Sequence, residues 1–498
     1  MDSPVLSAAQ MREAEEAAFG RGIEVEALMD RAGAGVARAI GRFFPNPGTC
    51  IVFAGKGHNG GDALVAAERL RRAGWKIDIR LAFAENDCSE LTRKKIEALR
   101  ETPENPNAPG RLIAPTIVLD GLLGLGATRL LREPIRACAA EINQLRRERN
   151  AFVFAVDLPT GLDGHTGEAD PDCVQAECTV TIGFGKHGLI EDAALDLVGR
   201  LEVVPLPELK PPEGARKEIL AAAHSLRPLL PHRKFSAYKN QFRRIGIIAG
   251  SKGFVGAALM TTQGALRAGA GLVEVFVPEE IYSIVADSAP QEAMVKPVRS
   301  YRELLDYGSI DIWAIGPGLG MKHGGEILKF IERDERSMVV DADGLNILAN
   351  KIDILKRCRG HRLLTPHPGE MKRLLDPGRM SRASIARNFC EQFPGVTLLF
   401  KGSRTIVAEF RRPLSFNTTG NPGMASGGMG DVLTGVCAGL LGQNLNLYDA
   451  ARLGAWVCGR AAEIAIFHAG ASEQSLLASD VLAHLGDAFN DLQSSVAD

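Results

Sequence analysis

A glycine-rich stretch, Asn417–Gly442, contains the residues whose types and spacing most clearly suggest chemistry. Several glycines precede Asp431, and an apolar run typical of a helix follows it. Bare glycine backbone lets N–H groups approach a ligand closely, and a helix N-terminus adds unpaired donors and a positive dipole end. The stretch therefore predicts an anion site suited to phosphate. Asp431 could cap the helix, accept a proton from a substrate hydroxyl, or do both.

A second candidate set lies in the first half of the chain, where polar residues stand just past predicted strands. Its members are Asn59, Asp120, Asp157 and Thr160. In an open α/β sheet the carboxyl ends of parallel strands meet at one edge, and ligands bind there. Oxygen donors from three strand ends could hold a monovalent or hard cation. Each acid taken alone could equally be a turn or cap residue.

A glycine motif precedes the helix that would carry Asn59. Gly55, Gly57 and Gly60 match GxGxxG between a predicted strand and a predicted helix, which is the context of a dinucleotide-binding turn. The acidic residue expected after the second strand has only a weakly placed candidate, Glu85. An NAD-dependent dehydrogenase therefore stays an alternative for this half.

The elements that must position these residues alternate between strands and helices. A capping box at Ser7–Gln10 predicts the first helix, and 25–44 predicts the second. Strands ending in glycine or polar turns are predicted at 50–54, 76–83, 116–119, 152–156, 245–249, 311–315, 337–340, 362–364, 397–400 and 414–416. The last two leave little room for a crossover, so a hairpin could join them. The region from residue 449 onward predicts helices.

This alternation predicts an α/β protein, and a proline-rich stretch at Val204–Gly214 predicts a linker between two domains. We expect one domain at 1–210, a linker at 211–224 and a second domain at 225–498. The two halves share no repeated motif. A P-loop is excluded in the second half, because Lys252 is followed by Gly253 instead of Ser or Thr.

Composition narrows the class of protein. The chain has 498 residues and a net charge of −2, so no strong field favours nucleic acid or an anionic membrane. The nine cysteines lack metal-site spacing and fit reduced thiols, and no apolar run is long enough to span a bilayer. Without features of a secretory signal, we expect a cytoplasmic protein that acts on small molecules and forms a homo-oligomer.

Four segments of the first half, GKGHNGGDALVAAERL, DGLLGLGATRLLREPI, VDLPTGLDGHTG and TIGFGKHGL, resemble the NAD(P)H-hydrate epimerase family (YjeF N-terminal) over about residues 5–205. The resemblance implies a Rossmann-like three-layer αβα domain that interconverts R- and S-NAD(P)HX. It implies substrate contacts from His58, Asn59, Gly60, Gly61, Asp62, Gly124, Leu125, Gly126, Ala127, Thr128, Arg129, Leu130 and Asp157. It also implies a potassium ion bound by Asn59, Asp120 and Thr160.

Two positions depart from that family's motifs. His58 replaces an asparagine, and Leu125 replaces a threonine hydroxyl. We expect epimerase activity to persist with altered affinity. Asp157 is the candidate acid/base, with Asp62 as the other, while Lys186 could either supply charge near the phosphates or be a surface lysine.

The second half resembles the ADP/ATP-dependent NAD(P)H-hydrate dehydratase family over about residues 225–490. The segments that carry this resemblance are AGSKGFVGAALMTTQGALRAGAGLV, IGPGLG, VDADGLNIL, LTPHPGEM, FKGSRT and TTGNPGMASGGMGDVLTG. The resemblance implies a ribokinase-like αβα domain in which Asp431 is the base. It implies contacts to the hydrated cofactor from Ala257, Gly318, His367 and Asp431, and contacts to ADP from Lys401, Gly402, Ser403, Arg404, Thr405 and Gly430.

Together the two resemblances imply repair of hydrated nicotinamide cofactors. The first domain would epimerise NADHX and NADPHX, and the second would dehydrate the S-epimer with ADP and Mg²⁺, releasing AMP and phosphate. One alternative is a small-molecule hydroxyl kinase of ribokinase-like fold fused to a Rossmann-type ligand-binding domain. A first half that only binds a ligand or a partner is a further alternative.

Overall fold

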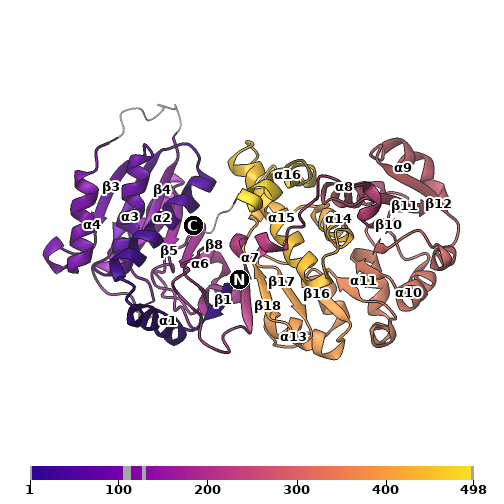
Figure 1. Ribbon diagram of the computed structural model, residues 1–498, viewed down its shortest axis with the longest axis horizontal. Coiled ribbons are helices and arrows are strands. Elements are labelled where there is room, and N and C mark those ends of the chain that lie inside the picture. Colours follow the sequence, from indigo (N-terminus) through magenta and orange to yellow (C-terminus); the bar gives the residue numbers. More distant parts are fainter. Residues whose placement is uncertain (1–2, 105–113, 126–129, 495–498) are drawn as a thin grey trace. The chain divides into compact units, whose positions relative to one another are not determined.

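The computed structural model describes residues 3–104, 114–125 and 130–494, and its chain divides into two compact units, Asp2–Leu220 and Ala221–Asp498. We call these the N-terminal and C-terminal units (Figure 1). The predicted site residues Gly126, Ala127, Thr128 and Arg129 lie outside the described residues. The segment expected to be a linker contains strand β9 (Glu218–Ala221) and the start of α7 (Ala223–Leu226).

The N-terminal unit is built on a parallel sheet in the order β3-β2-β4-β5-β6-β8. Its strands are β2 (Thr49–Ala54), β3 (Lys76–Leu81), β4 (Thr116–Gly121), β5 (Phe152–Val156), β6 (Cys178–Ile182) and β8 (Arg200–Val204). Its helices are α1 (Ala8–Gly20), α2 (Val25–Phe43), α3 (His58–Arg72), α4 (Glu90–Glu101), α5 (Ile135–Arg149) and α6 (Leu195–Val198). The strand order reverses beside β2, and in such sheets ligands bind where the order reverses.

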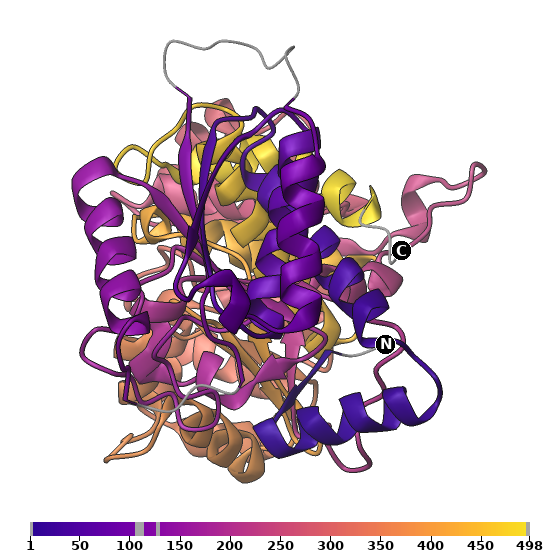
Figure 2. The same ribbon diagram turned by 90° about the vertical axis from the view of Figure 1, so that its left-hand side faces the viewer.

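Helices cover both faces of this sheet because successive strand residues point to opposite sides. Ile51 and Phe53 of β2 belong to a core cluster with Ile142 of α5. On the other face, α2 and α3 approach closely, since a Cβ at Gly33 would lie 2.5 Å from the Cβ of Val65. Helix α1 lies apart from these layers, at one end of the strands in Figure 1 and Figure 2. The predicted capping box opens it, with Ser7 and Gln10 bonded to each other's backbone N–H.

A small ribbon stands beside this sheet. Strand β1 (Ser3–Leu6) pairs in parallel with β7 (Gly185–Lys186) and antiparallel with β9. None of these three short strands was predicted from the sequence. In the parallel pair, Leu6 of β1 stands opposite Lys186 of β7.

The C-terminal unit has a sheet in the order β12-β11-β10-β13-β14-β15-β16-β17-β18, parallel from β12 to β16 and antiparallel beyond. The strands are β10 (Arg244–Ile248), β11 (Leu272–Pro278), β12 (Ala293–Val298), β13 (Ile312–Ile315), β14 (Ser337–Val340), β15 (Arg362–Leu364), β16 (Val396–Phe400), β17 (Ile406–Glu409) and β18 (Leu414–Asn417). The helices, besides α7, are α8 (Val255–Arg267), α9 (Tyr282–Ser288), α10 (Gly324–Arg333), α11 (Ala342–Ala349), α12 (Pro368–Leu374), α13 (Arg382–Gln392), α14 (Met429–Gly442), α15 (Leu447–Phe467) and α16 (Ala478–Ser494).

Glycines bring α14 and α8 together on one face of this sheet. A Cβ at Gly435 would lie 2.0 Å from the carbonyl oxygen of Thr261, and a Cβ at Gly264 would lie 2.5 Å from that of Val432. On the other face, Trp313 of β13 packs edge-on against Phe330 of α10. Both units are therefore three-layer αβα domains, and the predicted fold class is confirmed.

Two local predictions are wrong. A hairpin between 397–400 and 414–416 does not form, because β17 lies between these segments and pairs with both β16 and β18. Asp120 does not follow its strand but is the penultimate residue of β4. Among the described helices, none combines the length and apolar composition that a membrane span requires.

Candidate active sites

Asp120 and Thr160 form the centre of the first candidate site, at the carboxyl edge of the N-terminal sheet. Asp120 is fully buried and accepts hydrogen bonds from Thr160 Oγ1 at 2.6 Å and from Thr160 N at 2.8 Å. Thr160 Oγ1 in turn accepts from the backbone N–H of Leu123 at 3.2 Å. Burial raises the pKa of Asp120 to about 6, although the hydrogen bonds from Thr160 and Leu122 act in the opposite direction.

Asn59 reaches the same edge from the first turn of α3. A Cβ at Gly124 would lie 3.3 Å from Asn59 Oδ1, and a Cβ at Gly121 would lie 3.2 Å from the Asn59 carbonyl oxygen. Asn59 Nδ2 is buried without a hydrogen-bond partner in the described part of the chain. Of the three predicted potassium ligands, Asp120 and Thr160 are thus hydrogen-bonded to each other, and Asn59 lies beside Gly121 and Gly124, which follow Asp120 in the chain. Within the described ranges, the hydrogen-bond partners of Asp120 are Thr160 and Leu122, and no cationic side chain contacts it.

The glycine turn before α3 is fixed by backbone contacts. A Cβ at Gly60 would lie 2.1 Å from the Gly55 carbonyl oxygen, and a Cβ at Gly55 would lie 2.0 Å from that of Leu122. His58, the first residue of α3, is exposed, and no side chain caps this helix. The first N–H groups of α3 therefore remain without a side-chain cap from Gly57, as at the helix N-terminus of a dinucleotide-binding turn. Of the second predicted loop, Gly124 and Leu125 are described, and Leu130 is 66% exposed.

Asp157 and Lys186 form a buried ion pair beside this turn. Lys186 is fully buried, so the alternative of a surface lysine is wrong. Its ammonium group also donates to Thr181 Oγ1 at 3.0 Å and to the Ile182 carbonyl oxygen at 2.9 Å. Asp157 has a positive φ of 68°, and its Oδ1 accepts from Lys186, from Thr181 Oγ1 and from Ile182 N. Its Oδ2 has no partner among the described residues.

Two further carboxyls face this pair. Burial and then the charges of Asp157 and Glu15 raise the pKa of Asp62 well above its ordinary value, and Lys186 only partly offsets them. Burial also raises the pKa of Glu15, on α1, against the lowering effect of Lys186. Glu15 was not predicted from the sequence, because only tertiary folding brings α1 to the strand ends. Of the two candidate acid/base residues, Asp157 is thus paired with a lysine, whereas Asp62 is buried near two carboxylates.

The second candidate site lies in the C-terminal unit, at the start of α14. This helix begins at Met429 with Gly428 as its N-cap, and Gly428 has a φ of 89° that favours glycine. Asp431 is therefore the third residue of the helix and not its N-cap, and among the described residues its side chain has no hydrogen-bond partner. The cap interpretation of Asp431 is wrong. Burial, followed by the charge of Asp341, raises the pKa of Asp431 to about 6, and Lys401 lowers it only in part.

Lys401 connects this helix to two strand ends. It follows β16, and its Nζ donates to Asp341 Oδ1 at 2.8 Å and lies 3.9 Å from Glu370 Oε2. Asp341 follows β14, is 1% exposed, and also accepts from Thr434 Oγ1 at 2.8 Å. Asp341, Glu370 and Thr434 were not predicted as site residues, although Asp341 and Glu370 stand in the VDADGLNIL and LTPHPGEM segments.

The GPGLG turn forms another wall of this site. Gly318 has a φ of 60°, and a Cβ there would lie 2.9 Å from the Cβ of Ala257 on α8. Ser251 Oγ donates to the Gly318 carbonyl oxygen at 2.8 Å. The predicted substrate residues Gly318 and Ala257 are therefore adjacent, and a side chain at position 318 would collide with Ala257.

His367 opens α12 through a reciprocal cap. Its Nδ1 accepts from Gly369 N at 3.0 Å, and its backbone N–H donates to Glu370 Oε2 at 2.8 Å. The imidazole is half exposed, and Glu370 is buried. His367 thus joins Lys401 through their shared neighbour Glu370.

The predicted nucleotide loop after β16 is bonded to α13. Arg382 donates to the carbonyl oxygens of Phe400 and Lys401 at 3.3 Å each. Gly402 and Ser403 are exposed, while Arg404 is 4% exposed and Thr405 is partly buried. Two of the predicted nucleotide contacts thus face solvent, and the structure does not bring the Arg404 side chain to the surface.

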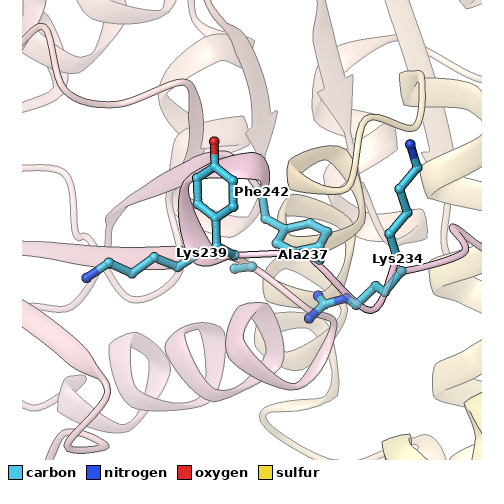
Figure 3. A pocket seen from close by; sticks show the side chains of 8 residues that line it. Lys234, Ala237, Lys239 and Phe242 are labelled. Carbon is cyan, nitrogen blue, oxygen red and sulfur yellow. The ribbon is translucent and has the colours of Figure 1, made fainter.

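A hollow of about 410 Å³ lies elsewhere in the C-terminal unit (Figure 3). Lys234, Lys239 and Phe242 line it together with Gly271, which precedes β11. Because parallel strands start at one edge of a sheet and end at the other, this hollow lies at the edge opposite Asp431. None of the predicted site residues lines it.

Comparisons with known proteins cover both units. Residues 25–188 match the family model described as YjeF-related protein N-terminus, and residues 245–484 match the one described as NAD(P)H-hydrate dehydratase. A solved structure, the ADP/ATP-dependent NAD(P)H-hydrate dehydratase from Bacillus subtilis co-crystallised with ATP/Mg²⁺, is 26% identical with a TM-score of 0.47, covering 54% of this chain and 97% of that chain.

Full-length relatives are more similar. A bifunctional NAD(P)H-hydrate repair enzyme Nnr from Moorella thermoacetica is 34% identical over 501 residues, covering 94% of this chain and 93% of that protein. The enzyme of the same description from Escherichia coli K12 is 34% identical over 486 residues, covering 94% and 90%. On this identity over nearly the whole of both chains, the protein belongs to the family of bifunctional NAD(P)H-hydrate repair enzymes.

Proposed function

We propose that this protein repairs hydrated NADH and NADPH in two steps. The N-terminal unit interconverts the R- and S-epimers of the hydrate, and the C-terminal unit dehydrates the S-epimer with ADP. The observation that carries the proposal is the pairing of two different sites in one chain, each at the carboxyl edge of its own sheet. Similarity to bifunctional repair enzymes along nearly the full length supports it.

In the C-terminal unit, Asp431 accepts the proton of the C6 hydroxyl group. The hydroxyl oxygen attacks the terminal phosphorus of ADP, and the bond to the bridging oxygen breaks, so that AMP leaves with the electron pair. Lys401 and the free N–H groups of α14 stabilise the charge on the transferring phosphoryl group. The C6–O bond then breaks, phosphate leaves with that electron pair, and loss of a proton from C5 restores the ring double bond.

In the N-terminal unit, inversion at C6 needs one proton donor and one proton acceptor, whether the ring opens or the hydroxyl group leaves. Asp62 is the donor, because burial and the neighbouring carboxylates of Asp157 and Glu15 raise its pKa and so favour the protonated carboxyl. Asp157 is the acceptor through Oδ2, the oxygen that Lys186 and its neighbours leave unoccupied. Two carboxyls with different surroundings can divide an acid role from a base role.

The proposed potassium and magnesium ions would be bound by different kinds of ligand. Asn59, Asp120 and Thr160 offer oxygen atoms around a buried carboxylate, and such a hard donor set suits a potassium ion. The ion would supply fixed positive charge beside the substrate turn. For magnesium, no cluster of three acidic, His or Cys side chains suited to a metal is present in the described ranges, so nucleotide oxygens and water would hold it.

The test uses a mixture of R- and S-hydrates and follows NADH absorbance. ADP should cause recovery of NADH together with free phosphate and AMP. A stable phosphorylated product without NADH would favour the hydroxyl-kinase alternative.

We also propose a cytoplasmic location and a homo-oligomer. All nine cysteines are free thiols, which supports a reducing location. Sedimentation of the full chain would test the homo-oligomer.

A further inference from the structure

We propose that Asp341 is a positioning residue for phosphoryl transfer, which holds the Lys401 ammonium group against the first turn of α14. This inference rests on the proposed dehydratase function. Asp341 itself does not touch the reacting atoms. It acts through Lys401, which would meet the terminal phosphoryl group of the nucleotide, and through its charge on Asp431.

The geometry fixes both oxygens of Asp341. Oδ1 accepts from Lys401 Nζ, and Oδ2 accepts from Thr434 Oγ1, both at 2.8 Å. One carboxylate thus joins the nucleotide loop after β16 to the second turn of α14. Its backbone is equally constrained, because Asp341 N donates to the Ile315 carbonyl oxygen at 3.0 Å. A Cβ at Gly316 would lie 1.9 Å from the Asp341 carbonyl oxygen.

Stability alone does not explain this buried pair. Removing a carboxylate and an ammonium group from water costs several kcal/mol per ion, and well-packed apolar residues often replace such pairs without loss of stability. The pair lies instead where an anion would bind. A Cβ at Gly430 would lie 3.2 Å from Lys401 Nζ and 3.4 Å from Asp341 Oδ2, so the bare first turn of α14 faces the ammonium group directly.

The carboxylates around Lys401 keep its ammonium group charged, as binding of an anion requires. Burial acts to lower the pKa of Lys401, but the carboxylates of Asp341 and Glu370 outweigh it and raise that pKa. Asp431 contributes in the same direction. Asp341 also raises the pKa of Asp431, while Lys401 lowers it. One buried carboxylate therefore keeps the lysine charged and makes the proposed base more basic.

The test compares Asp341→Asn with Glu274→Gln in the full chain. Glu274 is a matched control, since it is 2% exposed and accepts from Arg244 at 2.9 Å and from Tyr307 Oη at 2.7 Å, away from Asp431. For Asp341→Asn we expect kcat of ADP-dependent dehydration to fall about 10- to 100-fold. The KM for the S-hydrate should stay within about twofold, since the uniform binding contacts remain.

The pH profile separates positioning from a merely structural role. Loss of the Asp341 charge lowers the pKa of Asp431, so the acidic limb of kcat should move to lower pH in Asp341→Asn and stay in place in Glu274→Gln. The inference is overturned if the two variants match in kcat and in that limb. Thermal unfolding of the same preparations checks that the C-terminal unit is folded in each variant.

A second pair of variants keeps the inference testable if Asp341→Asn does not fold. Thr434→Val removes the hydroxyl group that fixes Asp341 Oδ2, and Thr262→Val removes a buried hydroxyl group that only donates to a helix carbonyl oxygen on α8. We expect a severalfold lower kcat for the first and no change for the second. Equal kcat values would contradict the role of Asp341. Absence of ADP-dependent dehydration in the unmodified chain would instead contradict the proposed function.

Discussion

Asp431 shows what residue-scale reasoning can and cannot predict. The glycine-rich stretch and the following apolar run predict a carboxylate in the first turn of a helix, and the structure places it there. The pKa of Asp431, in contrast, does not follow from the local sequence. Burial and Asp341, which stands 90 residues earlier in the chain, raise the pKa of Asp431, and no local pattern contains that information.

The proposed base role predicts the effect of Asp431→Asn. An amide cannot accept the hydroxyl proton, so kcat of dehydration should fall by about 10²- to 10⁴-fold. ADP binding, measured by calorimetry, should remain. In the unmodified enzyme, activity should rise with pH through about 6, where Asp431 ionises. Near-normal turnover of the variant would rule out the base role.

The same pKa predicts a stability effect. The folded-state pKa of Asp431 lies above the ordinary value of 3.8, so the folded state binds this proton more tightly than the unfolded state. The contribution of the protonated carboxyl to stability is therefore lost as pH rises from about 4 through about 6. At pH 7 Asp431→Asn should raise the free energy of unfolding of the C-terminal unit by up to about 2 kcal/mol. Thermal unfolding at pH 5 and pH 7 checks this, and a less stable variant at pH 7 would contradict it.

At the scale of elements, the sequence predicts most strands that carry site residues. An apolar run followed by a glycine or polar turn marks β5, β14 and β15 to the residue. It does not mark β17, or the two-residue β7 that holds Lys186, because such short segments are stabilised by their neighbours. Similarly, α1 is predicted from its capping box, but its approach to Asp157 depends on tertiary packing.

The start of α3 supplies an element-scale prediction with its own control. A Cβ at Gly60 would meet the backbone oxygen of Gly55 at 2.1 Å, whereas a Cβ at Gly61 would meet the flexible end of Met29 at 2.5 Å. Gly60→Ala should therefore lower the free energy of unfolding of the N-terminal unit by about 2–3 kcal/mol, and Gly61→Ala by clearly less. Urea unfolding of both variants measures the difference. Equal losses would show that the turn is less tightly packed than the structure indicates.

At the scale of the whole molecule, the chain divides into two units with one candidate site in each. The resemblance to two families predicts this division, and the residues of each site come from several strand ends of one sheet. Glu15, Asp341 and Thr434 were not predicted, because their importance comes from the partners that folding gives them. Gly126 and its three successors stay predictions from the sequence.

Two separate sites predict separable defects. Asp157→Ala should stop R-to-S conversion and leave dehydration of pure S-hydrate within about twofold, because Asp157 bonds to Thr181, Ile182 and Lys186 of the N-terminal unit. Asp431→Asn should give the reverse pattern. Chiral chromatography of the hydrates, together with NADH fluorescence, measures both. Loss of both activities in either variant would argue against independent sites.

The most direct test of the two-step repair is recovery of NADH absorbance from a mixed R/S hydrate, with ADP, Mg²⁺ and K⁺ added or withheld in turn. With all three present, the whole mixture should return to NADH, with one phosphate and one AMP for each hydrate. Without K⁺, we expect rapid recovery of the S fraction and slow recovery of the R fraction. The two-step repair would be contradicted if NADH recovered without ADP. It would also be contradicted if ADP were consumed to give a stable phosphorylated product and no NADH.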